Sequence, residues 1–175
     1  LGVTEVTIVL GYLGSKIRDA VQQWSPEIRV NFVDNAEYAS TNNGYSTLLA
    51  GPAASGHEFV LLDADIVCER EVIARVLRHE IPDCLGVRPS DSLGVEEMKI
   101  VLDDKGRVRE CAKTVDPKTA IGESIGINRF SPDASTRFFA ALEERVRGKG
   151  LVNEYNDSAV QQMIDDQNYE LWPVD

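Results

Sequence analysis

Residues 59–65 read Phe-Val-Leu-Leu-Asp-Ala-Asp, a short apolar run that ends in two acidic residues. Consecutive apolar residues without alternation are typical of a strand buried on both faces, as the central strands of a parallel sheet are. In an open α/β sheet, ligands bind beyond the carboxyl ends of the strands. The sequence therefore predicts a central parallel strand over residues 59–62, with Asp63 and Asp65 at the ligand-binding edge of the sheet.

Strand and helix patterns alternate around this run. Short β-branched runs predict strands, and apolar residues that recur every three or four positions predict the helices between them. The expected elements, in order, are a strand at 5–10, a helix from Ser15 to Pro26, a strand at 28–33, a helix at 41–50 that ends at Gly51, the strand at 59–62 and a helix around 72–77. This order is typical of a parallel sheet with helices on both faces.

The second half of the chain has a different character. Apolar runs at 98–102 and 108–112 flank a turn-rich loop that contains glycine, which predicts an antiparallel hairpin. The remaining expected elements are a glycine-interrupted strand at 121–130 that lies close to a ligand, a helix after Ser131-Pro132, a helix at 157–165, and a segment at 171–175 that approaches a strand without forming one. We therefore expect a single domain over residues 1–175, with an α/β fold: a three-layer, Rossmann-like, mostly parallel sheet with an antiparallel hairpin annex.

Charge and composition exclude several classes of protein. Eighteen Lys and Arg against 29 Asp and Glu give a net charge of −11 and a pI near 4.6, so the phosphate backbone of nucleic acid would be repelled. No apolar run approaches the roughly 20 residues that cross a bilayer. The three cysteines lack Cys-x-x-Cys spacing, which argues against a zinc site or a disulfide framework. The sequence predicts a cytoplasmic protein with reduced thiols that binds neither nucleic acid nor membrane.

The Asp-x-Asp pair suits a hard divalent cation, because carboxylate oxygens are the ligands that such ions prefer. Alternation in an extended segment sends the two side chains to different sides, so one can bind metal while the other orients a hydroxyl group or water. The pair alone leaves open haloacid-dehalogenase-like phosphatases, nucleotide-sugar glycosyltransferases and nucleotidyltransferases. The phosphatases normally carry the pair on their first strand, whereas two predicted strands precede Asp63 here.

Short segments along the whole chain narrow this choice. They are 9–12 (VLGY), 42–46 (NNGYS), 63–65 (DAD), the hairpin that leads to Lys113, 122–127 (GESIGI) and 154–157 (EYND). In this order they resemble the nucleoside-triphosphate transferase superfamily, and within it the phosphocholine cytidylyltransferase-like branch. The resemblance implies a nucleotide-diphospho-sugar transferase-like fold, and transfer of CMP from CTP to a phosphate or phosphonate monoester with release of pyrophosphate.

The resemblance also implies roles for individual residues. Asp65 would hold Mg²⁺ on the phosphates of CTP or another nucleoside triphosphate, and Lys113 would bind the acceptor phosphate; these two are the expected catalytic residues. The expected nucleotide-binding residues are Thr41, Asn42, Asn43, Gly44, Ser46 and Asp63, and those for the second, phosphorylated substrate are Glu123, Glu154, Tyr155 and Asp157. The residue types suit these roles, because asparagine amides match a cytosine edge and a tyrosine ring offers a face to a trimethylammonium group.

Two parts of the family pattern fall outside residues 1–175. Family members begin with a strand and a glycine-rich loop that cradle the triphosphate, and they end with a strand that carries a second metal-binding aspartate. We therefore expect residues 1–175 alone to catalyse poorly. The alternative functions are a sugar-1-phosphate nucleotidyltransferase, a metal-dependent glycosyltransferase that uses a nucleotide sugar, and a non-catalytic nucleotide-binding domain.

Overall fold

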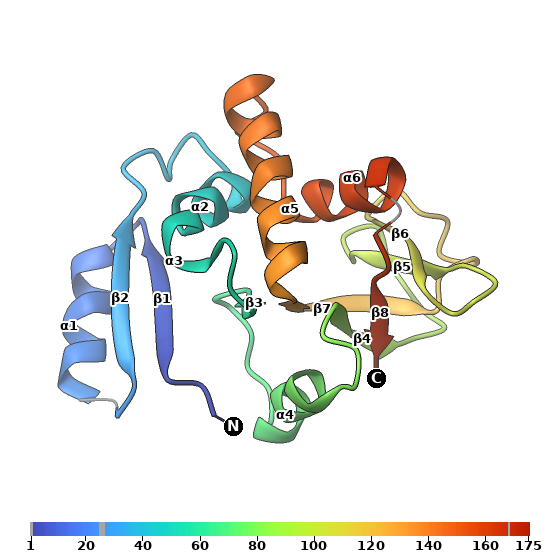
Figure 1. Ribbon diagram of the computed structural model, residues 1–175, viewed down its shortest axis with the longest axis horizontal. Coiled ribbons are helices and arrows are strands. Elements are labelled where there is room, and N and C mark those ends of the chain that lie inside the picture. The colour runs from blue at the N-terminus through green and yellow to red at the C-terminus, as the bar shows by residue number, and fades with distance from the viewer. Residues whose placement is uncertain (1, 25–26, 168) are drawn as a thin grey trace.

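The computed structural model describes residues 2–24, 27–167 and 169–175, and it shows a mixed α/β fold, as the sequence predicts (Figure 1). Pro26, expected to end the first helix, lies outside the described residues. Among the described residues, no helix combines the length and the apolar character needed to cross a bilayer. The elements are β1 (Glu5–Leu10), α1 (Gly14–Trp24), β2 (Arg29–Asp34), α2 (Asn43–Leu49), α3 (Gly51–Ala54), β3 (Phe59–Leu62), α4 (Arg70–Arg78), β4 (Cys84–Pro89), β5 (Lys99–Leu102), β6 (Val108–Ala112), β7 (Gly122–Phe130), α5 (Pro132–Glu143), the π-helical turn η1 (Glu144–Gly148), α6 (Asp157–Gln167) and β8 (Trp172–Val174).

The first two strands form a small parallel sheet of their own. β1 and β2 pair in parallel along their whole length, and α1 lies along one side of this pair in Figure 1. No residue of α1 is fully buried: Ile17 is 42% exposed and Trp24 83%. The helix carries the apolar stripe that the sequence predicts, but a sheet of two strands is too narrow to cover it.

The other strands in the described part of the chain form one mixed sheet, in the order β6-β5-β7-β4-β8, with β3 also paired to β7. β7 is antiparallel to β3, β4 and β5, β6 is antiparallel to β5, and β8 is parallel to β4. Therefore β3, β4, β5 and β8 run in one direction, and β6 and β7 in the other. Most strands share a direction, as predicted, but the expectation that residues 59–62 form a central parallel strand was wrong. β7 runs against β3, and Leu62 is 47% exposed.

Two strands of this sheet were not expected from the sequence. β4 reads Cys-Leu-Gly-Val-Arg-Pro, in which glycine and a terminal proline obscure the strand pattern. Residues 172–174, expected only to approach a strand, form β8, where Trp172 pairs with Cys84 of β4. Three residues with a proline at their centre have little strand propensity of their own. The pairing with β4 therefore makes this segment a strand.

α5 packs the main core onto the sheet. It begins at Pro132, one residue before the predicted start: Ser131 is its N-cap, and the Ser131 hydroxyl accepts a hydrogen bond from the N–H of Ala134 at 3.2 Å. The buried face of α5 carries Phe138 and Phe139. Phe130 of β7 stacks on Phe138 with 4.6 Å between the ring centroids. Aromatic pairs at this spacing stabilise a core beyond the area that they bury.

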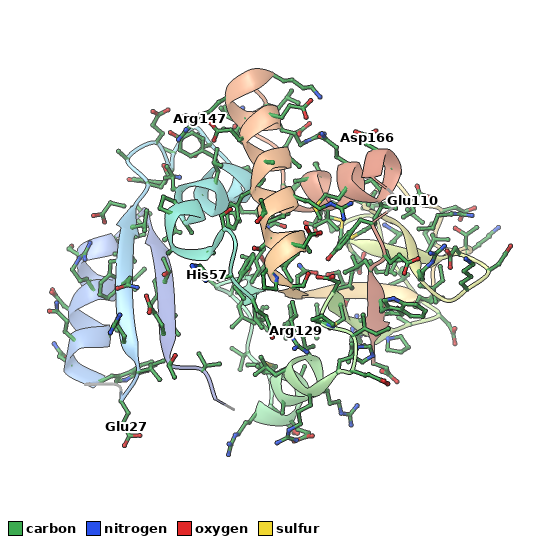
Figure 2. The ribbon with its side chains drawn as sticks, viewed as in Figure 1. Glu27, His57, Glu110, Arg129, Arg147 and Asp166 are labelled. Carbon is green, nitrogen blue, oxygen red and sulfur yellow. The ribbon has the colours of Figure 1, made fainter. Side chains whose placement is uncertain are left out.

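α4 covers the opposite face of the sheet. Val76 of α4 packs on Cys84 and Ile127 in a second, smaller core cluster. Arg129 of β7, labelled in Figure 2, donates to the carbonyl oxygens of Val76 at 3.3 Å and His79 at 3.0 Å. The guanidinium group thus satisfies carbonyl groups that the end of the helix leaves free. With α5 and α6 on one face and α4 on the other, the sheet is the middle of three layers (Figure 1).

Candidate functional site

A cleft of about 560 Å³ opens at the end of β3. Clefts of roughly 300 to 1,000 Å³ commonly hold small organic ligands. Five parts of the chain form its walls: the start of α2, the turn after β3, the open end of the β5–β6 hairpin, the first half of β7 and the start of α6. Its lining residues are Asn43, Asp63, Ala64, Asp65, Met98, Lys113, Ser124, Gly126, Tyr155 and Asp157.

Several residues singled out in the sequence meet in this cleft. They are Asn43, Asp63, Asp65, Lys113, Tyr155 and Asp157. The segment that carries Asn43 and the turn that carries Asp63 and Asp65 therefore share one cavity. The expected nucleotide-binding and metal-binding roles both require this arrangement. The sequence places the acidic turn at the end of a strand and the asparagine at the start of a helix, which are positions where ligands collect in α/β folds.

Carboxyl groups crowd one part of the cleft. Burial raises the pKa of Asp63, and the charge of Asp65 raises it further. Burial, followed by the charge of Asp63, raises the pKa of Asp157 to about 6. The thiol of Cys111 partly offsets this rise as a weak donor to Asp157, with 3.9 Å between Sγ and Oδ1. These carboxylates repel one another, and a bound cation would relieve the repulsion.

Asp63 and Asp65 fit a divalent cation that is held jointly with a substrate. Within residues 2–24, 27–167 and 169–175, no group of three or more His, Cys, Asp or Glu side chains is arranged to hold a metal ion. Mg²⁺ is often bound by one or two carboxylates, with water and substrate phosphates as its other ligands. The pair in the cleft therefore suits a cation that arrives with a nucleotide better than a permanently resident metal.

Lys113 brings a positive charge to the cleft. Its Nζ lies 3.1 Å from Oε2 of Glu96 and 4.9 Å from the centre of the Tyr155 ring. The hydrogen bond to Glu96 raises the pKa of Lys113, so the amine stays protonated at neutral pH. Glu96 is 85% exposed on its side chain. Ion pairs with so exposed a partner are weak, so an incoming phosphate group can replace the carboxylate.

The asparagines at the start of α2 hold two segments together. Asn42 is the N-cap of α2, since its Oδ1 accepts a hydrogen bond from the N–H of Asn43 at 2.8 Å. Oδ1 of Asn43 accepts from the N–H of Asn156 at 2.9 Å, and the N–H of Gly44 donates to the carbonyl oxygen of Glu154 at 3.2 Å. These bonds join the expected nucleotide side of the cleft to the loop that leads into α6.

Thr41, Asn42, Gly44 and Ser46, expected to contact the nucleotide, lie outside the lining of the cleft. The hydroxyl groups of Thr41 and Ser46 both accept hydrogen bonds from the Nδ2 group of Asn35, at 3.1 and 3.0 Å. Asn35 is buried, so this network fixes the turn before α2. In the structure these residues shape the segment that presents Asn43.

Glu123 and Glu154, expected to contact the second substrate, also lie outside the lining. Glu123 forms an ion pair with Arg88 across β7 and β4, with 2.6 Å between the charged atoms. Glu154 forms an ion pair with Arg145 at 2.7 Å. Both carboxylates are therefore neutralised by arginines before any ligand binds.

Four lining residues were not among the site residues expected from the sequence: Ala64, Met98, Ser124 and Gly126. Gly126 had a signal, because glycine interrupting a strand indicates close approach of other atoms. Its φ is +70°, and a Cβ there would lie 2.5 Å from Oδ2 of Asp63. Met98 and Ser124 reach the cleft through pairing of distant segments, in which the N–H of Ser124 donates to the carbonyl oxygen of Met98 at 2.8 Å. Sequence periodicity alone does not reveal such a pairing.

Replacing Gly44 by alanine should destabilise the protein by about 1 to 2 kcal/mol, because overpacking outweighs the gain in helix propensity. A Cβ at position 44 would lie 2.7 Å from the carbonyl oxygen of Glu154, a backbone atom that cannot rotate away. Gly148→Ala is the matched control, since its Cβ would meet nothing closer than Cγ of Glu144 at 3.9 Å. Urea unfolding measures both variants; equal midpoints for G44A and the unsubstituted protein would contradict the close packing described here.

Solved structures share this fold, a mixed sheet with helices on both faces. The chain is similar to CTP:phosphocholine cytidylyltransferase from Streptococcus pneumoniae (LicC), with a TM-score of 0.68 and 16% identity, over 98% of this chain and 69% of that chain. It is also similar to UDP-glucose pyrophosphorylase, with a TM-score of 0.67 and 11% identity, over 97% of this chain and 72% of that chain. HddC from Yersinia pseudotuberculosis gives a TM-score of 0.58 and 15% identity, over 77% of this chain and 59% of that chain.

These likenesses bear on the fold. No protein-family model and no curated protein matches the sequence of the chain. At 11 to 16% identity, the solved structures confirm the predicted fold.

Proposed function

We propose that this protein is a nucleotidyltransferase that transfers CMP from CTP to a small phosphate or phosphonate monoester and releases pyrophosphate. The observation that carries the proposal is the shared cleft, in which Asn43, Asp65, Lys113 and Tyr155 meet from four separate segments. The likeness in fold to CTP:phosphocholine cytidylyltransferase supports a cytidine nucleotide and a phosphocholine-like acceptor.

Each side of the cleft offers groups that suit one substrate. Asn43, at the start of α2, offers an amide to the edge of a nucleobase. Asp63 and Asp65 would hold Mg²⁺, which neutralises charge on the phosphates of the nucleotide when it is bound. Lys113 would bind the phosphate of the acceptor, and the ring of Tyr155 beside it would contact a cationic head group.

The reaction needs positioning and charge neutralisation from the protein. An oxygen of the acceptor phosphate attacks the α-phosphorus of CTP, the bond from that phosphorus to the bridging oxygen breaks, and pyrophosphate leaves with the bonding electrons. Lys113 would reduce the repulsion between the two anions as they approach. Such a transfer requires no covalent intermediate on the protein, so a serine or cysteine nucleophile is not needed.

Pyrophosphate release tests this proposal. The protein expressed from its full reading frame is incubated with Mg²⁺, phosphocholine and each of the common nucleoside triphosphates in turn. We expect CTP to react at least about tenfold faster than the others, and mass spectrometry to show a CDP-linked product. If neither phosphocholine nor a phosphonate analogue gives pyrophosphate with any triphosphate, the proposal is wrong.

A sugar-1-phosphate nucleotidyltransferase is the second candidate. The TM-score to UDP-glucose pyrophosphorylase, 0.67, is almost equal to the 0.68 of the cytidylyltransferase. Glucose 1-phosphate with UTP therefore enters the same assay, and the acceptor with the higher kcat/KM decides between the two. Turnover of a preformed nucleotide sugar without pyrophosphate would instead support a glycosyltransferase.

A further inference from the structure

Lys99, at the start of β5, is a buried lysine that the proposed reaction does not use. Lys99 is only 1% exposed, and its Nζ donates hydrogen bonds to the carbonyl oxygens of Glu97 at 3.1 Å and Lys113 at 2.7 Å. Among the described residues it forms no ion pair with a carboxylate. A buried charge without a partner of opposite charge lowers stability, so a role in stability alone is a weak explanation for this side chain.

The two hydrogen bonds of Lys99 tie together two segments that lead into the cleft. Residues 90–98 connect β4 to β5 and carry Glu96 and Met98, and Lys113 begins the loop that follows β6. The ammonium group of Lys99 bridges the backbone of both segments. It therefore fixes where the Lys113 side chain starts relative to Glu96, its partner at 3.1 Å.

A further buried polar atom lies in the same segment. Oε2 of Glu97 is buried and has no hydrogen-bond partner within the described ranges of the chain. The start of β5 thus holds a buried cation and a buried carboxylate oxygen that are not paired with each other. Buried polar groups without a partner are costly and rare, so each one calls for an explanation.

We propose that Lys99 is a positioning residue for the acceptor phosphate: its buried ammonium group holds the backbone at Lys113, so that the Lys113 side chain lies between Glu96 and the ring of Tyr155. This inference rests on the proposed function, in which Lys113 binds the acceptor. Lys99 itself does not touch substrate. A displacement of about 1 Å in a group that positions a reactant can cost up to about a hundredfold in rate.

Substitution of Lys99 separates positioning from simple structural support. Lys99→Met keeps the length of the apolar stem and removes the donors, and Lys99→Arg keeps charge and donors in a wider group. We expect K99M to raise the KM for phosphocholine about tenfold, and K99R about threefold, while the KM for CTP changes less than about twofold. If K99M does not fold, K99R alone is interpreted by the same criterion. An unchanged KM for phosphocholine, or equal rises for both substrates, would overturn the proposal.

A measurement without substrates separates this inference from the proposed function. The pKa of the Lys113 amine is followed by NMR of labelled lysine side chains in the unsubstituted protein and in each folded Lys99 variant, with Lys113→Arg to assign the signal. We expect the pKa of Lys113 to fall in K99R, which keeps the positive charge at position 99, because the hydrogen bond to Glu96 is the largest cause of the raised pKa. An unchanged pKa would refute the positioning role even if the protein is active. Absence of activity with all triphosphates would refute only the proposed function.

Discussion

Replacing Asp65 by asparagine should reduce nucleotidyl transfer by at least about a hundredfold in kcat/KM and leave the fold intact. The cleft offers Asp63 and Asp65 as carboxylates for a divalent cation, and the variant removes the expected principal ligand. It also removes a charge that raises the pKa of Asp63. We therefore expect D65N to be as stable as the unsubstituted protein or slightly more stable, because the repulsion between the two carboxylates is lost.

Pyrophosphate release at increasing Mg²⁺, together with thermal unfolding, measures both effects of D65N. Asp104→Asn is the matched control, since Asp104 is an exposed residue in the turn of the β5–β6 hairpin, away from the cleft lining. Loss of activity in D65N that high Mg²⁺ partly restores indicates weakened cation binding. A D65N variant with full activity at all Mg²⁺ concentrations would show that the metal site is elsewhere.

Stability should fall as the pH rises from about 4 to about 7, and Asp157→Asn should remove most of this fall. The folded protein raises the pKa of Asp157 to about 6, mainly through burial and then through the charge of Asp63. A carboxyl group with a raised pKa binds its proton more tightly in the folded state than in the unfolded state. Its favourable contribution is therefore present at low pH and is lost as the pH rises from its unfolded value to about 6, by about 2 to 3 kcal/mol in total.

Urea unfolding of the unsubstituted protein and D157N at several pH values tests this dependence. We expect D157N to be the more stable of the two at pH 7, and the difference to disappear near pH 4. Asp166→Asn is the control, because Asp166 is an exposed carboxylate on the same helix (Figure 2). If the two proteins lose stability in parallel as the pH rises, Asp157 is not the group responsible.

The sequence predicted most elements of this fold, and its failures have physical causes. The strands of the β5–β6 hairpin and the start of α5 were each predicted to within one residue, because turn and capping residues are local signals. The predicted parallel pairing of β3 was wrong. β7 begins 60 residues after β3 ends, and nothing local in Phe59–Leu62 encodes the direction of this partner strand. β8 depends on β4 for its pairing, so a segment with a central proline became a strand.

The site was predictable to the extent that chemistry is carried by residue type. Asp63 and Asp65 were predicted as an acidic pair that follows a strand, Lys113 was predicted from the family resemblance, and all three line the cleft. Glu123 and Glu154 were predicted from the same resemblance, but each forms an ion pair with an arginine, Glu123 with Arg88 and Glu154 with Arg145. Whether an acidic residue faces a ligand or an internal partner depends on tertiary contacts that residue type and spacing do not carry.

β7 is more than twice as long as β3, which it pairs with only through its second half. Its first half continues past the last residue of β3 and forms the floor of the cleft. There β7 pairs with β4 on one side and with β5 on the other. Ser124 and Gly126 both line the cleft from this floor. Gly126 admits no side chain, because a Cβ there would lie 2.5 Å from Oδ2 of Asp63, so position 124 is where a larger or smaller side chain would change how deep a ligand can sit.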